Sequence, residues 1–134
     1  MNPKIEWLSR AKDIQLEIRQ LQEVRRRAFD QLTRVTPSMS GMPGGGSTDE
    51  HKTDRLVILD SLIEEQKQKL AESYEEILRA IETVPSATGR TILKDLYIMG
   101  KSWEQIARHV HYSTRQCQRL HGKALTVIKI PGMQ

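Results

Sequence analysis

The sequence is poor in cysteine, in aromatic residues and in long apolar segments. Its single cysteine, Cys117, cannot form an internal disulfide, which suits the reducing interior of a cell. Aromatic residues make up only 4% of the 134 residues and charged residues 28%, a composition that favours helices over a β-sandwich. No segment approaches the roughly 20 apolar residues of a membrane helix, and the charged N-terminus lacks a signal peptide's apolar core. We therefore expect a soluble cytoplasmic protein with no membrane partner.

Positive charge is concentrated toward the C-terminus. The whole chain has a net charge of +4, but residues 1–89 carry 13 Lys/Arg against 15 Asp/Glu. Residues 90–134 carry eight Lys/Arg against two acidic residues, a net charge of +6. Such a basic segment indicates a polyanionic partner such as double-stranded DNA. The alternative interpretation, and the simpler one on charge alone, is that these residues form a basic surface in contact with solvent and bind no polyanion.

The N-terminal part has the apolar periodicity of long helices. Between residues 3 and 35 apolar residues recur at alternating spacings of three and four, a heptad pattern that only Arg25 interrupts. At this position either a carboxylate on the facing helix, such as Glu65 or Glu72, pairs with the arginine, or the seam opens. Residues 56–84 repeat apolar side chains every seven positions.

The segment between these two helices is rich in glycine and proline. Pro37, Pro43 and three successive glycines are incompatible with a helix interior, so we predict a flexible loop over residues 36–48. Two long helices joined by a loop most simply form an antiparallel hairpin. Residues 1–84 are therefore predicted to be a coiled-coil-like hairpin. Because polar residues weaken the apolar seam of its second helix, we expect the hairpin to pair two chains into a homodimer. The pattern leaves open whether the hairpin closes within one chain or between two.

Residues 85–134 have the pattern of a second domain with three short helices. Gly100 is placed to end the first of them as a C′ glycine. Ser102 and Ser113 each precede a helical segment and are followed three residues later by glutamine, the capping-box spacing. Two helices set so closely together predict a helix-turn-helix. The predicted fold is thus all-α, a long N-terminal helical hairpin joined to a C-terminal three-helix helix-turn-helix domain.

The residues of this motif divide into an inward and an outward set. The inward set is predicted to pack the helices together, with one member in the turn (Val110), and consists of Trp103, Ile106, Ala107, Val110, Cys117, Leu120 and Ala124. Arginine can pair with guanine and glutamine with adenine in the major groove. The predicted base contacts, in the first turns of the last helix, are Thr114, Arg115, Gln118 and Arg119. The predicted phosphate contacts are Lys101, Ser102, Arg108, Ser113, Gln116 and Lys123. Gly122, which has no side chain, allows close approach to a DNA backbone or to a partner.

The C-terminal segment also resembles a known family. Residues 91–125, TILKDLYIMGKSWEQIARHVHYSTRQCQRLHGKAL, resemble region 4 of sigma factors and the related phage-encoded transcriptional regulators of the RinA/ArpU type. The upstream SMSGMPGGG resembles a loop of the same small phage and prophage proteins. The resemblance implies a regulator of late phage genes in the cytoplasm of a bacterial host. Nothing in the chain resembles the part of a sigma factor that binds the other promoter element, so a complete sigma factor is not expected.

Two other functions stay open. The chain can instead dock on host RNA polymerase with little DNA affinity of its own, or it can be a small DNA-recognition subunit of a phage packaging terminase. Zinc binding is disfavoured because the candidate ligands match no common zinc spacing; these are His109, His111, Cys117 and His121. No catalytic or nucleotide-binding spacing is present. We therefore expect no catalytic activity, no metal and no cofactor.

Overall fold

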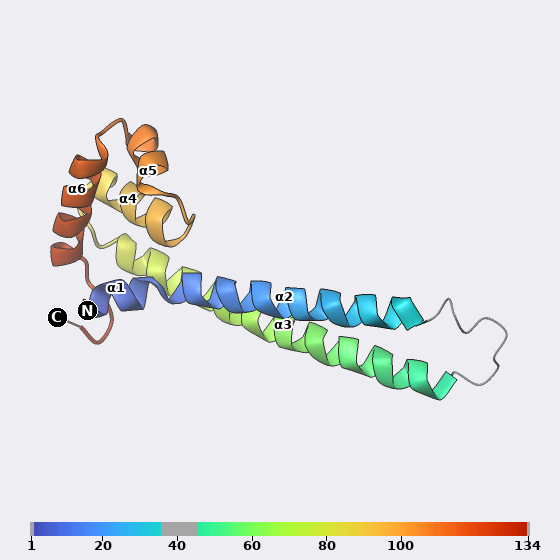
Figure 1. Cartoon of the computed structure of the whole chain (residues 1–134). Coiled ribbons are helices and arrows are strands. Elements are labelled where there is room, and N and C mark those ends of the chain that lie inside the picture. Colours follow the sequence, from blue (N-terminus) through green and yellow to red (C-terminus); the bar gives the residue numbers. More distant parts are fainter. Residues whose placement is uncertain (1, 36–45, 134) are drawn as a thin grey trace. The chain divides into compact units, whose positions relative to one another are not determined.

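The computed structural model describes residues 2–35 and 46–133, and it describes side chains for residues 2–33 and 53–133. Over these residues the chain forms six helices and no strand (Figure 1), which confirms the all-helical prediction. The helices are α1 (Pro3–Leu8), α2 (Arg10–Val35), α3 (Gly46–Ile81), α4 (Ala87–Tyr97), α5 (Trp103–Val110) and α6 (Thr114–Val127). In the part of the chain that the structure describes, none of these helices combines the length and the apolar character that a membrane span requires.

The chain divides into two compact units, and each is described by itself. The first unit contains residues 1–13 and 70–134, and the second contains residues 14–69. This division differs from the boundary predicted at residue 84. The difference arises because the N-terminal segment and the last turns of α3 share a hydrophobic core with the C-terminal helices.

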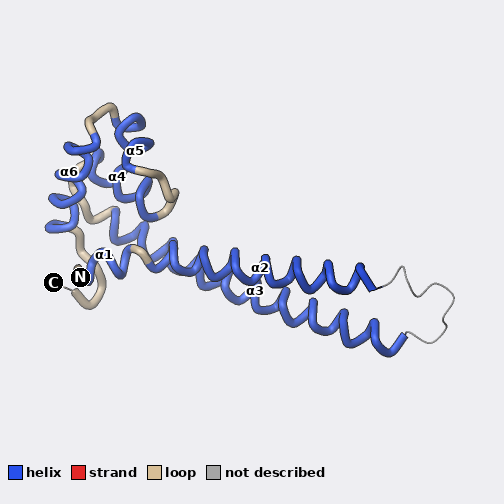
Figure 2. Tube along the Cα trace, in the orientation of Figure 1, coloured by secondary structure: helices blue, strands red, loops and turns tan. Residues whose placement is uncertain are grey.

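The ends of the long helices also differ from the sequence pattern. Residues 3–35, predicted as one helix, form two helices separated at Ser9 (Figure 2). Most of the loop predicted over residues 36–48 lies outside the described residues. Helix α3 begins at Gly46, however, so residues 46–48 are helical where a loop was expected. A glycine is tolerated there because it stands at the first position of the helix and not in its interior.

The second unit consists of the long parts of α2 and α3. These segments lie side by side and run in opposite directions (Figure 1). Ile18 and Ile63 are its most buried apolar side chains, at 7% and 6% exposure. Arg25, which interrupts the apolar seam of α2, forms an ion pair with Asp60 on α3. The facing helix thus supplies a carboxylate for the interrupting arginine, but the partner is Asp60 and not Glu65 or Glu72, the two candidates from the sequence.

The larger core of the first unit joins segments that are far apart in the sequence. Leu8 and Ala11, from the N-terminal segment, have no exposed surface and pack with residues at the end of α3 and in α4 and α6. The buried members of this core are Leu8, Ala11, Ile77, Ala80, Ile81, Val84, Leu93, Tyr97, Ala124, Leu125, Ile128 and Ile130. Because buried apolar area is the main source of stability, packing on the N-terminal segment stabilises α4 and α6.

Candidate nucleic-acid interface

Helix α5 begins with the capping box that the sequence predicts. The Ser102 hydroxyl accepts a hydrogen bond from the Gln105 backbone N–H at 3.2 Å, and the Gln105 side chain accepts one from the Ser102 N–H at 2.9 Å. Just before it, Gly100 adopts the left-handed region, with φ of 69°. The chain can therefore reverse, and the Lys101 N–H donates to the Asp95 carbonyl at 2.9 Å. Helix α4 ends slightly earlier than predicted, with Ile98 as its C-cap.

A turn of three residues, 111–113, joins α5 to α6. His111 is left-handed, with φ of 63° and ψ of 38°, and the N–H of this residue donates to the Ala107 carbonyl. Ser113 caps α6, because its hydroxyl accepts the Gln116 N–H at 3.1 Å. Val110, which was predicted to lie in the turn, is instead the last residue of α5, because the reversal occurs one residue later.

The three C-terminal helices enclose a small core of their own. Ile92 from α4, Ile106 from α5 and Cys117 from α6 have no exposed surface. The partly buried residues around them are Leu96, Trp103, Ala107, Val110 and Leu120. The inward set predicted from the sequence is therefore found here with one exception. Ala124 is buried in the larger core beside Leu125, because α6 continues beyond the short α5 and meets the N-terminal segment there.

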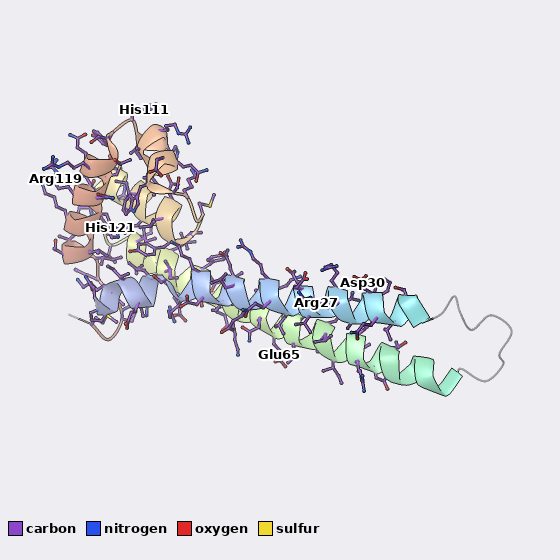
Figure 3. All side chains as sticks on the ribbon, in the orientation of Figure 1. Arg27, Asp30, Glu65, His111, Arg119 and His121 are labelled. Atoms are coloured by element: carbon purple, nitrogen blue, oxygen red, sulfur yellow. The ribbon has the colours of Figure 1, made fainter. Side chains whose placement is uncertain are left out.

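The outward face of α6 carries the residues predicted to contact bases. Thr114, Arg115, Gln118 and Arg119 are all exposed. Within the part of the chain that the structure describes, neither Arg115 nor Arg119 forms an ion pair. Figure 3 shows Arg119 pointing away from the helices, whereas His121 points toward them. These two guanidinium groups are thus available to an external anion or base edge.

The predicted phosphate contacts are in different situations. Arg108, Gln116 and Lys123 are exposed. The hydroxyls of Ser102 and Ser113 serve as helix caps by accepting backbone N–H groups, so each keeps its own O–H as a donor. Lys101 is engaged inside the unit, because its amine lies 3.3 Å from a carboxylate oxygen of Asp95. Its predicted role as a phosphate contact therefore competes with this ion pair.

Asp95 was not singled out from the sequence, and it links α4 to α5. It is only 4% exposed. One of its carboxylate oxygens lies 2.5 Å from Nδ1 of His109 on α5, and the other lies near the Lys101 amine. A carboxylate removed from water needs such partners. A sequence signal exists in retrospect, because Asp95 stands three residues after Ile92 and so shares the inward face of α4.

A second polar contact joins α4 to α6. The Tyr97 hydroxyl and Nε2 of His121 are 2.7 Å apart, and the Trp103 ring meets the His121 ring edge-to-face at 5.5 Å. Burial, and secondarily the charge of Lys12, lower the pKa of His121 below its ordinary value. Burial raises the pKa of Tyr97 to about 12. The pair is therefore neutral at pH 7, and the inward side of α6 is fixed by an uncharged hydrogen bond.

The four groups considered as zinc ligands do not converge. Cys117 lies in the small core, His109 contacts Asp95, and His121 contacts Tyr97. Over residues 2–33 and 53–133, no cluster of three or more His, Cys, Asp or Glu is arranged to hold a metal ion. Comparison of the sequence and structure with family models, curated proteins and solved structures gave no match.

Proposed function

We propose that this chain is a phage-encoded, sequence-specific DNA-binding transcription regulator whose α5 and α6 form a helix-turn-helix. The observation that carries the proposal is the outward face of α6, where Arg115 and Arg119 are exposed and form no ion pair with any described residue. The helix that presents them is capped by Ser113 and anchored by the buried Cys117. A rigid helix with free arginines on its first turns is what readout of base edges requires.

The surrounding residues support contact with a duplex. Residues 90–134 have a net charge of +6, which favours approach to phosphates at any sequence. Arg108 and Lys123 are exposed cations on α5 and α6, and we assign them to phosphates. Thr114 and Gln118 complete the base-reading surface with Arg115 and Arg119. The resemblance to sigma region 4 and RinA/ArpU-type proteins supports a role in late phage transcription.

We also propose that the second unit joins two chains into a homodimer. Its only well-buried large apolar side chains among the described residues are Ile18 and Ile63, whereas several others are 41–59% exposed. The exposed ones are Leu16, Val24, Phe29, Val57, Ile58 and Leu62. Association of two such units would remove apolar surface from water. A dimer would also present two copies of α6 to the two half-sites of a palindromic operator.

The first test is capture of DNA fragments from the source genome. We expect the wild type to select one or a few fragments, and the variant Arg115→Ala/Arg119→Ala to lose this selectivity. Each bidentate arginine contact contributes about 1–3 kcal/mol of discrimination. The matched control is Arg19→Ala/Arg55→Ala, which removes the same charge from exposed positions of the second unit. Selective binding should weaken steeply with added salt, because several phosphate contacts release counterions.

The other outcomes point to the alternative functions. Equal and weak capture of every fragment by the wild type and both variants contradicts sequence readout and directs attention to host RNA polymerase as the partner. Selective capture by a ring-shaped oligomer, measured by sedimentation and by electron microscopy, favours a packaging subunit over a dimeric regulator. A dimer that captures a single fragment supports the regulator.

A further inference from the structure

Nothing in the described part of the chain requires glycine at Gly122, unlike at three other described glycines. Gly100 and Gly132 have φ values of 69° and 79°, which glycine adopts without strain. A Cβ on Gly89 would lie 3.3 Å from a Val84 methyl group, so tight packing favours glycine there. Gly122 is not left-handed, and a Cβ built on it meets no atom within 4 Å. Neither backbone conformation nor internal packing therefore requires glycine at this position.

A glycine in this place also works against the stability of the helix. Gly122 lies in the interior of α6, five residues before the helix ends at Val127. Glycine is the least favourable residue after proline in a helix interior, because it loses the most backbone freedom on folding. Alanine, which fits the open space, would stabilise α6. A contact from outside the chain would account for the glycine.

The place of Gly122 on α6 indicates what that contact is. It is exposed and follows Arg119 by three residues and Arg115 by seven, so all three lie on the outward face. Gly122 stands eight residues after Thr114, which corresponds to about 12 Å along the helix axis. The major groove is about as wide, at roughly 12 Å. When the first turns of α6 lie in the groove, Gly122 is therefore near the groove's edge, where the helix passes the sugar–phosphate rim.

We propose that Gly122 is a DNA-contact position, at which the missing side chain lets the backbone of α6 approach a DNA sugar–phosphate strand. The inference rests on the proposed function and deepens it, because it defines how closely α6 docks. A Cβ at this position would hold the helix away from the rim and move Arg115 and Arg119 out of reach of base edges. Stability and DNA affinity should therefore respond to substitution in opposite directions.

The test compares Gly122→Ala and Gly122→Leu with the wild type on the fragment that the wild type selects. We expect Gly122→Ala to raise the thermal midpoint, because alanine favours the helix. The same variant should lower the affinity for the fragment about fivefold or more, because the added methyl group would overpack the contact between the helix and the DNA strand. Gly122→Leu should lower the affinity further while the helix stays folded. Opposite changes of midpoint and affinity support the proposal.

The Arg115→Ala/Arg119→Ala variant, measured beside them, separates failure of this inference from failure of the proposed function. Unchanged affinity in Gly122→Ala together with lost selectivity in the arginine variant overturns the role of Gly122 and leaves the regulator intact. A wild type that selects no fragment overturns both. A lowered thermal midpoint in Gly122→Ala also overturns the inference, because it would show that glycine is required by the fold itself.

Discussion

The amine of Lys4 donates hydrogen bonds to the main-chain oxygens of Leu125, at 2.7 Å, and Ile128, at 3.4 Å. Leu125 is in the last turn of α6, where carbonyl groups have no partner within the helix. The helix that we propose to read DNA is thus completed at its far end by the fourth residue of the chain. The negative end of the α6 dipole is a favourable place for this cation.

Replacing Lys4 by methionine should destabilise the first unit. Lys4→Met keeps an apolar stem but removes the charge and both hydrogen bonds, so we expect the free energy of unfolding to fall by about 1 kcal/mol. Urea unfolding followed by circular dichroism measures the change. Lys69→Met, at an exposed position of α3, is the matched control and should change stability little. If both substitutions change the free energy of unfolding equally, the two hydrogen bonds of the Lys4 amine do not stabilise the unit.

The contact between Asp95 and α5 predicts a larger effect. Asp95→Asn keeps the size of the side chain but removes the charge that faces His109 and Lys101. We expect a loss of about 2 kcal/mol, since the two donors are left with a weaker acceptor in a buried place. Glu104→Gln removes one carboxylate from the exposed surface of α5 and is the control. The measurement is the thermal unfolding of both variants. Similar midpoints for Asp95→Asn and Glu104→Gln would contradict a structural role of Asp95.

The sequence predicts local features of this fold well. Ser102 and Ser113 cap their helices as predicted, because a cap is a bond between residues three positions apart, although of the two only Ser102 is described with the full capping box. Ile106 and Cys117 are buried as their helical spacing predicts. The packing of Leu8 against α6 was not predictable, because a heptad pattern identifies an apolar face without naming its partner. The contact of Lys4 depends on that same long-range packing, and the ion pairs of Asp95 depend on how α4 packs against α5.

The left-handed conformation of His111 gives a prediction about the turn. A residue with a Cβ is strained at φ of 63°, and glycine is not. His111→Gly should therefore raise the free energy of unfolding by about 1 kcal/mol. His111→Ala is the control, because alanine loses the imidazole but keeps the Cβ and hence the strain. If both variants change stability equally, the effect comes from the imidazole and not from the backbone.

The lowered pKa of His121 predicts a dependence of stability on pH. Burial disfavours the charged imidazole in the folded chain, whereas the unfolded chain titrates near the ordinary value of 6.5. Above this pH both states are neutral at His121, and the residue adds no pH dependence. As the pH falls through 6.5 the unfolded chain takes up the proton first, so stability decreases. The decrease ends once the pH is below the folded pKa.

The measurement is the free energy of unfolding at a series of pH values for the wild type and for His121→Gln. Glutamine does not titrate and can still hydrogen-bond the Tyr97 hydroxyl, so the wild type should lose stability relative to this variant only on the acid side. His111→Gln removes an exposed imidazole and is the control for loss of a histidine elsewhere in the same unit. His109, beside Asp95, is present in all three proteins. The difference between the curves of the wild type and His121→Gln therefore reports on His121. Parallel curves for the wild type and His121→Gln would show that His121 takes up its proton equally in the folded and unfolded chains, in contradiction to its burial against Tyr97 and Trp103.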